Sequence, residues 1–223
     1  MDTDCSDFEE YRRCLADLAQ VNAITLTHRP TLAWLARETN GLAGFSLLDV
    51  GCGHGDLLRR IRRWATGRGL AATLTGLDSH GWSARAAAEA TPAEDRINYV
   101  TADLFDFDPP SRFDFIVSSQ FMHHLTDEQA VAFIRWQEAH AARGWFVADL
   151  RRHWFAHRGF PLLARAARWH RFVRTDGQIS IARAFLPEEM RGLAIAAGIA
   201  PGDLEVTRET PFRIAMARRC VHR

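Results

Sequence analysis

Apolar and polar positions alternate along residues 45–150 with two distinct periods. Five short apolar runs predict buried strands, at residues 45–50, 71–77, 97–101, 113–119 and 145–150. Between these runs apolar residues recur every three or four positions and predict helices, as in the stripe formed by Leu57, Leu58, Ile61 and Trp64. Strands that alternate with helices in this way predict an α/β fold, with a mostly parallel sheet and helices on both of its faces.

The regions on either side of this core follow other patterns. Two amphipathic segments, residues 7–20 and a stretch from Pro30 to Thr39, predict a helical cap within residues 1–44, over one end of the sheet. After the core, residues 187–197 predict a helix. Two further strands, at residues 204–208 and 212–217, are expected to form a hairpin at the sheet edge. We therefore expect seven strands in a single domain that spans residues 1–223.

Residues 151–186 interrupt the alternation and predict a helical insertion, or lid, after the fifth strand. Eight arginines in this segment stand against one acid, Asp176. Aromatic residues are interleaved with them: Trp154, Phe155, Phe160, Trp169 and Phe172. An amphipathic lid helix with solvated arginines explains this composition, and so does a surface that binds an acceptor molecule.

Composition narrows the class of protein without naming a function. Hydrophobic residues make up 47% and charged residues 25% of the 223 residues, which is ordinary for a soluble globular domain. A net charge of +1 argues against a chain built as a whole to bind polyanions. No apolar run is long enough to span a membrane, and the acidic start is unlike a signal peptide, so we expect a cytoplasmic location. The four cysteines lack C-x-x-C spacing, which favours free thiols over a disulfide or a metal site.

The first predicted strand leads into three glycines, Gly51, Gly53 and Gly55, spaced as G-x-G-x-G. A strand, a glycine turn and a helix in succession are typical of a Rossmann-like sheet that holds a nucleotide-like ligand. The dinucleotide fingerprint is G-x-G-x-x-G, so a nicotinamide-dependent oxidoreductase is disfavoured. The turn carries no basic residue to match a diphosphate, and Asp49 and Asp56 flank it instead. These charges favour a cationic ligand.

Four segments in order resemble the motifs of class I S-adenosylmethionine-dependent methyltransferases, small-molecule type. They are Leu47 to Gly55, Gly76-Leu77-Asp78, Ala102-Asp103-Leu104 and Phe113 to Ser119, and Phe121 to Leu125 resembles the sequence that follows in many small-molecule members. The resemblance covers roughly residues 45–150 and implies S-adenosylmethionine as the cofactor and a reversed final strand.

The resemblance also implies roles for individual residues. It places Gly51, Gly53 and Gly55 along the cofactor, with Asp49 near its amino group. Asp78 would bind the ribose with Ser79 beside it, Asp103 and Leu104 would border the adenine, and Ser118 would offer backbone near the methionine moiety. From its place in the predicted cap, Arg29 is expected to pair with the cofactor carboxylate.

Three histidines are candidates for the catalytic base: His123, His124 and His153. His123 and His124 follow the fourth strand, and His153 follows the fifth, where Asp149 could orient it. Histidine suits proton removal from an oxygen acceptor near neutral pH. A packing role for these histidines, or a salt-bridged loop, is the competing interpretation. The residues expected to contact the acceptor are His28, Gln120, Arg152, Trp154 and Trp169.

The sequence thus favours a methyltransferase that acts on a hydroxyl of an aromatic or polyketide-like secondary metabolite. Methylation at carbon or nitrogen stays open, and so does a methyltransferase-like binding subunit without activity of its own. A nucleic-acid acceptor is disfavoured, because the D-P-P-S segment at residues 108–111 precedes the fourth strand instead of following it. We expect no metal, and a monomer or a homodimer.

Overall fold

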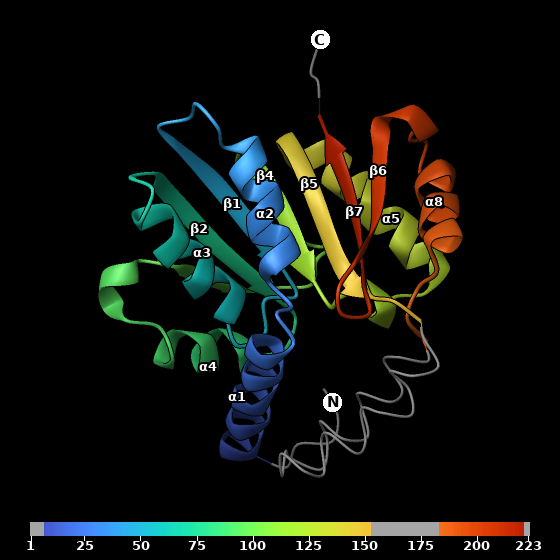
Figure 1. The fold of residues 1–223 in the computed structure, drawn as a ribbon. Coiled ribbons are helices and arrows are strands. Elements are labelled where there is room, and N and C mark those ends of the chain that lie inside the picture. Colours follow the sequence, from blue (N-terminus) through green and yellow to red (C-terminus); the bar gives the residue numbers. More distant parts are fainter. Residues whose placement is uncertain (1–6, 153–182, 221–223) are drawn as a thin grey trace.

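The computed structural model describes residues 7–152 and 183–220, which form a sheet covered by helices (Figure 1). The strand order is β3-β2-β1-β4-β5-β7-β6. The strands are β1 (Gly44–Val50), β2 (Ala71–Asp78), β3 (Asn98–Thr101), β4 (Phe113–Ser119), β5 (Ala141–Leu150), β6 (Leu204–Glu209) and β7 (Arg213–Arg219). Neighbouring strands run parallel except at β7, which is antiparallel to β5 and to β6. The predicted α/β class, a Rossmann-like and mostly parallel sheet of seven strands, is confirmed.

Helices cover both faces of the sheet. One face packs against α2 (Arg29–Glu38) and α3 (Asp56–Thr66), and the other against α5 (Asp127–His140) and α8 (Pro187–Ala196). The shorter elements are α4 (Ser83–Glu89) and the 3-10 turns η1 (Ala93–Asp95), η2 (Met122–His124) and η3 (Pro201–Asp203). No helix in the described ranges is both long and apolar enough to cross a bilayer.

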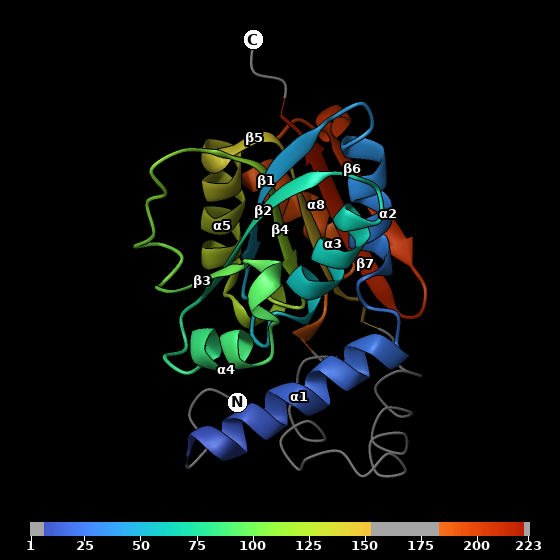
Figure 2. The same cartoon turned by 90° about the vertical axis from the view of Figure 1, so that its left-hand side faces the viewer.

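The helix α1 (Phe8–Ile24) lies across the end of the sheet at which the parallel strands finish (Figures 1 and 2). The ring of Tyr11 stacks on His80, with ring centroids 4.0 Å apart, and its hydroxyl lies 2.6 Å from Ser83 Oγ. These contacts hold α1 over the connection between β2 and α4. The helix therefore closes one side of the edge where Rossmann-like sheets bind ligands.

The sequence placed both N-terminal helices in the cap, but α2 packs on a face of the sheet. Its apolar side buries Trp34, whose ring lies 5.2 Å from the ring of Phe146 and 5.4 Å from that of Phe115. A helix that carries such a large apolar group gains most by covering the sheet itself. Of these two helices, α1 alone lies over the end of the sheet.

The starts of α5 and β5 show where the predicted element boundaries agree with the structure and where they differ. Thr126 begins α5 as predicted, and its side chain and that of Gln129 form a reciprocal capping box. In contrast, β5 begins at Ala141, four residues before the predicted start at Trp145. Residues 141–144 carry small and charged side chains without apolar alternation, so the pairing with β4 alone makes them a strand.

Candidate active site

The glycine turn joins β1 to α3 at the carboxyl edge of the sheet. Gly51 and Gly55 both have φ of +71°, a left-handed backbone conformation that favours glycine. The N–H groups of Gly51 and Cys52 donate to the carbonyl oxygen of Leu77 at 2.8 and 3.1 Å, which ties the turn to β2. A Cβ atom on Gly51 would lie 2.5 Å from the ring of Phe121. Glycine is therefore needed for both the backbone conformation and the packing.

Three carboxylates surround this turn, and we call this group the acidic end: Asp49, Asp56 and Asp78. Asp78 accepts hydrogen bonds from the N–H of Gly53 at 2.9 Å and from the N–H of His80 at 3.0 Å. Asp49 is 2% exposed. Its burial, and then the charges of Asp56 and Asp78, raise the pKa of Asp49 well above its usual value. The acidic end thus combines a hydrogen-bonded carboxylate with a deeply buried one.

A chain of polar side chains connects Asp56 to the rest of the site. His28 Nε2 lies 2.7 Å from Asp56 Oδ2, and Asn22 Nδ2 donates to the same oxygen at 3.1 Å. Gln120 Nε2 donates in turn to Asn22 Oδ1 at 2.5 Å. Burial works against ionisation of Asp56, but the hydrogen bond and charge of His28 prevail and lower its pKa to about 2. Asp56 is therefore ionised at neutral pH, and it holds His28 in place.

Several predicted cofactor residues lie elsewhere than the glycine turn. Arg29 is exposed, whereas its neighbour His28 is buried against Asp56. Ser79 and Asp103 are exposed at the ends of β2 and β3. Leu104 is 6% exposed and packs into the core. The roles suggested for these residues stay predictions.

Beyond β4 and β5 a second constellation joins His123 to Asp149. His123 Nδ1 lies 2.7 Å from Asp149 Oδ1, and the two side chains are buried. Asp149 also accepts from the N–H of His123 at 3.1 Å and from the N–H of Leu150 at 2.7 Å. Burial opposes the charge of Asp149, but His123 and these N–H groups lower its pKa. An ionised Asp149 keeps the proton on Nδ1 and leaves the lone pair on Nε2.

The other two histidines differ from His123. His124 is exposed, and its ring lies beside that of His123 with centroids 4.1 Å apart. His153 lies outside the described residues, as do Trp154 and Trp169. The sequence assigned Asp149 to orient His153, but in the structure its carboxylate accepts from His123 instead. Among the described histidines, His28 and His123 both combine burial with a carboxylate on one ring nitrogen and an unbonded second nitrogen. Of these two, His123 is the one that lines a pocket.

Sequence reasoning missed Arg213, the first residue of β7. Its guanidinium is buried, and its terminal nitrogen Nη2 donates to the hydroxyls of Thr25 and Thr27 at 3.1 and 2.8 Å. Burial lowers its pKa to about 10, partly offset by the charge of Asp149. Charged residues are rare at the start of an otherwise apolar strand. That departure from the pattern of β7 was the one available signal.

A pocket of about 630 Å³ opens between the start of α5 and α8. Its wall includes His123, His124 and three apolar side chains, Leu125, Phe185 and Leu193. Arg152 and Arg183 contribute the positive charges. The pocket thus reaches the histidine constellation from the side of the sheet away from α2.

Several buried polar atoms around this edge have no hydrogen-bond partner among the described residues. They include His28 Nδ1, Asp49 Oδ1, Ser118 Oγ, Ser119 Oγ, His123 Nε2, Arg151 Nε and Arg213 Nε. A buried polar atom without a partner costs about 1–3 kcal/mol. Such atoms gathered from β1, β4, β7 and the connecting segments indicate a site built for a polar ligand.

Residues 47–144 match the family model described as a methyltransferase domain. The matched range contains the glycine turn, Asp49, Asp78 and His123. This part of the chain is a methyltransferase domain. The match agrees with the predicted resemblance to class I S-adenosylmethionine-dependent methyltransferases.

Solved structures agree with this methyltransferase fold. Magnesium protoporphyrin IX methyltransferase from Synechocystis, solved with bound S-adenosylhomocysteine, superposes with a TM-score of 0.61 at 16% identity, covering 97% of this chain and 89% of the other. Human N-acetylserotonin methyltransferase in complex with S-adenosylmethionine gives a TM-score of 0.67 at 16% identity, covering 97% and 57%. At such low identity the similarity establishes the fold alone.

Curated relatives share part of the methyltransferase domain. The ubiquinone biosynthesis O-methyltransferase of Nitrobacter winogradskyi is 36% identical over 93 residues, which cover 41% of this chain and 33% of the relative. The enzyme of the same name from Bradyrhizobium sp. is 29% identical over 119 residues, covering 51% and 45%. The chain thus spans less than half the length of these relatives.

Proposed function

We propose that this chain is a methyltransferase that uses S-adenosylmethionine to methylate an oxygen atom of a small molecule, with His123 as the general base. The buried pair of His123 and Asp149 is the observation that carries this proposal. The relatives named O-methyltransferases support it, because they share the domain that contains His123.

The acidic end fits the proposed cofactor. Asp49 Oδ1 is a buried acceptor without a partner, suited to an ammonium group. Asp78, held by the N–H of Gly53, is suited to ribose hydroxyls, and Ser118 adds another buried oxygen without a partner. When bound, the cofactor would supply a methyl group on a positively charged sulfur.

His123 provides the proton transfer that an oxygen acceptor needs. Asp149 fixes the tautomer in which Nε2 accepts, and it stabilises the imidazolium that forms. Nε2 of His123 would take the proton from the acceptor oxygen as that oxygen is methylated. The proton on His123 would then return to water.

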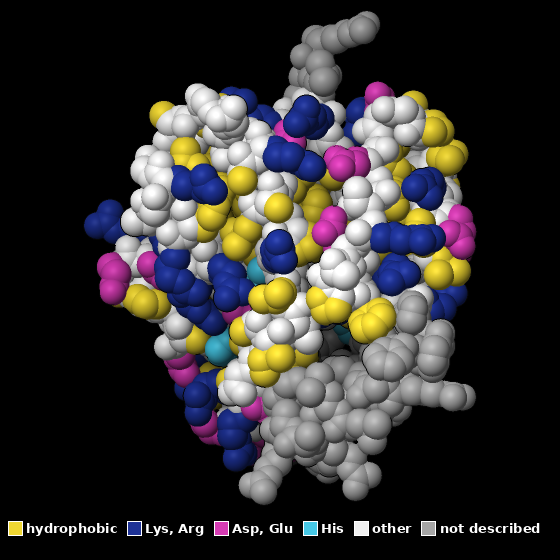
Figure 3. Space-filling view, in the orientation of Figure 1, with side chains coloured by type: hydrophobic (Ala, Val, Ile, Leu, Met, Phe, Trp, Pro, Cys, Tyr) yellow, Lys and Arg dark blue, Asp and Glu magenta, His cyan; other side chains and the backbone are white. Residues whose placement is uncertain are grey.

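A small acceptor agrees with the shape and charge of the molecule. The wall of the pocket beside His123 combines the apolar side chains Leu125, Phe185 and Leu193 with polar and charged ones, which suits a small molecule with an aromatic ring and polar groups. On the face shown in Figure 3, basic side chains are scattered among hydrophobic and acidic ones and form no continuous stripe for a polyanion. We propose an aromatic or polyketide-like metabolite as the acceptor class.

The experiment that tests this function separates cofactor binding from turnover. Calorimetry with S-adenosylhomocysteine measures binding, and mass spectrometry detects methyl transfer to a panel of phenols, amines and carbon acids. We expect cofactor binding, and methyl transfer to phenols alone. Transfer to amines or carbon acids would contradict O-methylation. Binding without any transfer by the isolated chain would favour a non-catalytic subunit, and absence of binding would refute the proposal altogether.

A further inference from the structure

The two sides of the ligand edge carry opposite charges. The acidic end lies beyond β1 and β2. Beyond β5 and at the start of β7 lie four arginines that we call the basic end: Arg151, Arg152, Arg183 and Arg213. The strand order puts β4 between these two groups, so one edge of the sheet changes from acidic to basic along its length. If the acidic end holds a cationic cofactor, the basic end is suited to a ligand of opposite charge.

Among the arginines of the basic end, Arg213 gives the strongest evidence for an anionic ligand. Its side chain is only 7% exposed, and no carboxylate oxygen of the described residues lies within the 4.0 Å that defines an ion pair. The hydroxyls of Thr25 and Thr27 are neutral and accept hydrogen bonds from Nη2, whereas Nε has no partner. Burial of a cation that is not paired is costly, so its retention calls for an anion at this place.

The neighbouring carboxylates do not supply that anion. Asp149 already accepts from His123 and from the N–H of Leu150. Glu189 accepts from Arg152 at 3.0 Å and from the N–H of Leu186 at 2.7 Å. Glu209, which pairs in register with Arg213, accepts from the hydroxyl of Thr207 at 3.0 Å. Each of these acids thus has hydrogen bonds to other groups, and Nε of Arg213 keeps unused donor capacity.

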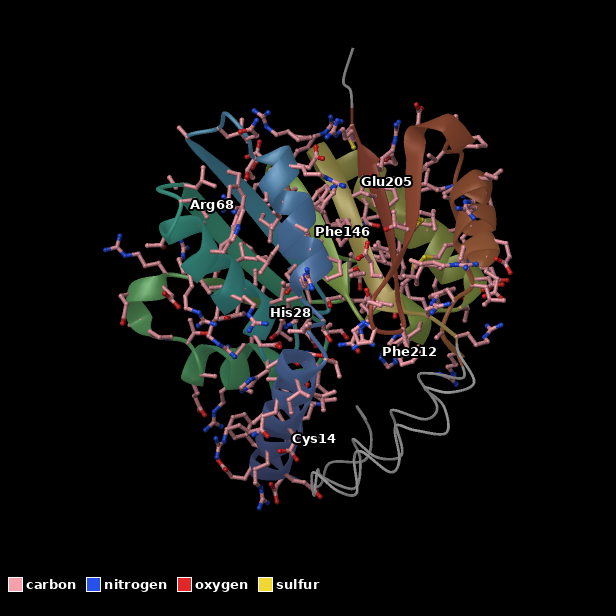
Figure 4. All side chains as sticks on the ribbon, viewed as in Figure 1. Cys14, His28, Arg68, Phe146, Glu205 and Phe212 are labelled. Carbon is pink, nitrogen blue, oxygen red and sulfur yellow. The ribbon has the colours of Figure 1, made fainter. Side chains whose placement is uncertain are left out.

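The geometry places this capacity beside the proposed base. Arg213 pairs in register with Leu150, the residue that follows Asp149. Figure 4 shows that His28 and Phe212, which precedes Arg213, both lie near the end of the sheet that faces α1. The pocket wall brings His123 together with Arg152 and Arg183 on the other side of β5. A ligand in this pocket therefore meets Arg152 and Arg183 as well as Asp127 and Glu189. Arg213 lies outside the pocket wall, at the start of β7, close enough to Asp149 to feel its charge.

We propose that the methyl acceptor carries a carboxylate and that Arg213 is the residue that binds it, with Arg152 and Arg183 adding to the favourable potential. This inference rests on the proposed function and specifies its substrate class. A guanidinium N–H forms a strong, charge-assisted hydrogen bond with a carboxylate, and the unbonded Nε of Arg213 supplies such a donor. A neutral acceptor of the same shape would leave the buried cation without its partner.

Two probes of the same size test the proposal: 3,4-dihydroxybenzoate and 3,4-dihydroxybenzamide. Their affinities for the full chain saturated with S-adenosylhomocysteine are measured by calorimetry. We expect the benzoate to bind about tenfold more tightly than the amide, as a charge-assisted hydrogen bond allows. Arg213→Gln should abolish this preference and bring the ratio of the two affinities close to one.

Thr27→Val provides the matched control. It removes a hydroxyl that Arg213 contacts but keeps the charge, so the preference for the benzoate should persist. If Thr27→Val abolished the preference as fully as Arg213→Gln, the role of Arg213 would be structural and the proposal overturned. Equal affinities in the wild type, or no binding of either probe, would also overturn it. Failure of S-adenosylhomocysteine to bind would instead refute the proposed function.

Discussion

The acidic and basic ends share one edge of one sheet, yet they are built differently. At the acidic end the charges of Asp56 and Asp78 are engaged by His28 and by backbone N–H groups. At the basic end Arg213 is buried with neutral partners only. The first arrangement is complete within the protein, apart from Asp49 Oδ1. The second is left for a ligand to complete. The comparison indicates that the cofactor site is already arranged before a ligand binds, whereas the basic end selects the acceptor by its charge.

The two ends also differ in how the chain assembles them. The acidic end draws on Asp49 and Asp56, seven positions apart in sequence, with Asp78 on the adjacent strand. His123, Asp149 and Arg213 come together only when β4, β5 and β7 pair. A change at the acidic end should therefore affect cofactor binding, and a change at the other end should affect turnover and acceptor choice.

The largest effect is expected from His123→Gln. Loss of the general base should lower kcat by about 100- to 10,000-fold, because proton removal from the acceptor oxygen is no longer assisted. Cofactor affinity should change by less than about twofold, since a proton-transfer group adds little to ground-state binding. Initial rates at saturating cofactor and calorimetry measure the two quantities. An undiminished kcat would remove acid–base catalysis by His123 from the mechanism.

Asp78→Ala should mainly weaken cofactor binding, in contrast to His123→Gln. It removes the proposed ribose ligand and the acceptor of the Gly53 N–H, so Kd for S-adenosylhomocysteine should rise by about 10- to 100-fold. Asp127→Ala is the control, because that exposed carboxylate at the start of α5 lies away from the glycine turn. Equal losses in the two variants would show that overall charge, and not the site, governs cofactor affinity.

Asp56 makes stability depend on pH. The pKa of Asp56 is lowered to about 2 in the folded chain. Its contribution to the unfolding free energy is therefore fully present at pH values above the pKa that Asp56 has in the unfolded chain. That contribution is lost as the pH falls through the pKa of Asp56 in the folded chain. The contribution should be about 2 kcal/mol at neutral pH. Chemical unfolding of wild type and Asp56→Asn at several pH values measures it. The difference in unfolding free energy should shrink between pH 4 and pH 2, and a constant difference would contradict the ion pair with His28.

The smallest effect concerns the turn itself. Gly51→Ala places a methyl group 2.5 Å from the Phe121 ring, whereas Gly53→Ala meets only Leu15, at 3.8 Å. Both positions have positive φ, so the backbone strain is shared. Gly51→Ala should lower the unfolding free energy by about 1–3 kcal/mol more, from overpacking alone. Thermal or denaturant unfolding measures the difference, and equal losses would mean that packing against Phe121 is unimportant.

The sequence predicted the features that are local. The strand periods, the glycine turn with its flanking acids and the capping residue Thr126 each depend on neighbours within a few positions. For this reason the sheet and the acidic end were foreseen in most respects. The position of α2 was not, because the burial of Trp34 against Phe146 depends on a contact between distant parts of the chain.

The histidine constellation shows where sequence reasoning stops. The pattern identified three candidate histidines but could not tell which would meet a carboxylate, because that depends on the register of β4 and β5. Asp149 was assigned to His153, four positions away, and contacts His123 instead. Arg213 escaped notice for a related reason, since its neighbours Thr25 and Thr27 come from the far end of the chain.

The reversed direction of β7 has a consequence for how this fold can diversify. Because β7 runs against its neighbour β5, its first residues and the turn after β6 lie at the ligand edge, although they come last in the chain. Residues 210–213 can therefore change during evolution or engineering without altering the glycine turn. The acceptor repertoire of such an enzyme can be reshaped from a short hairpin tip, while the cofactor machinery is inherited intact.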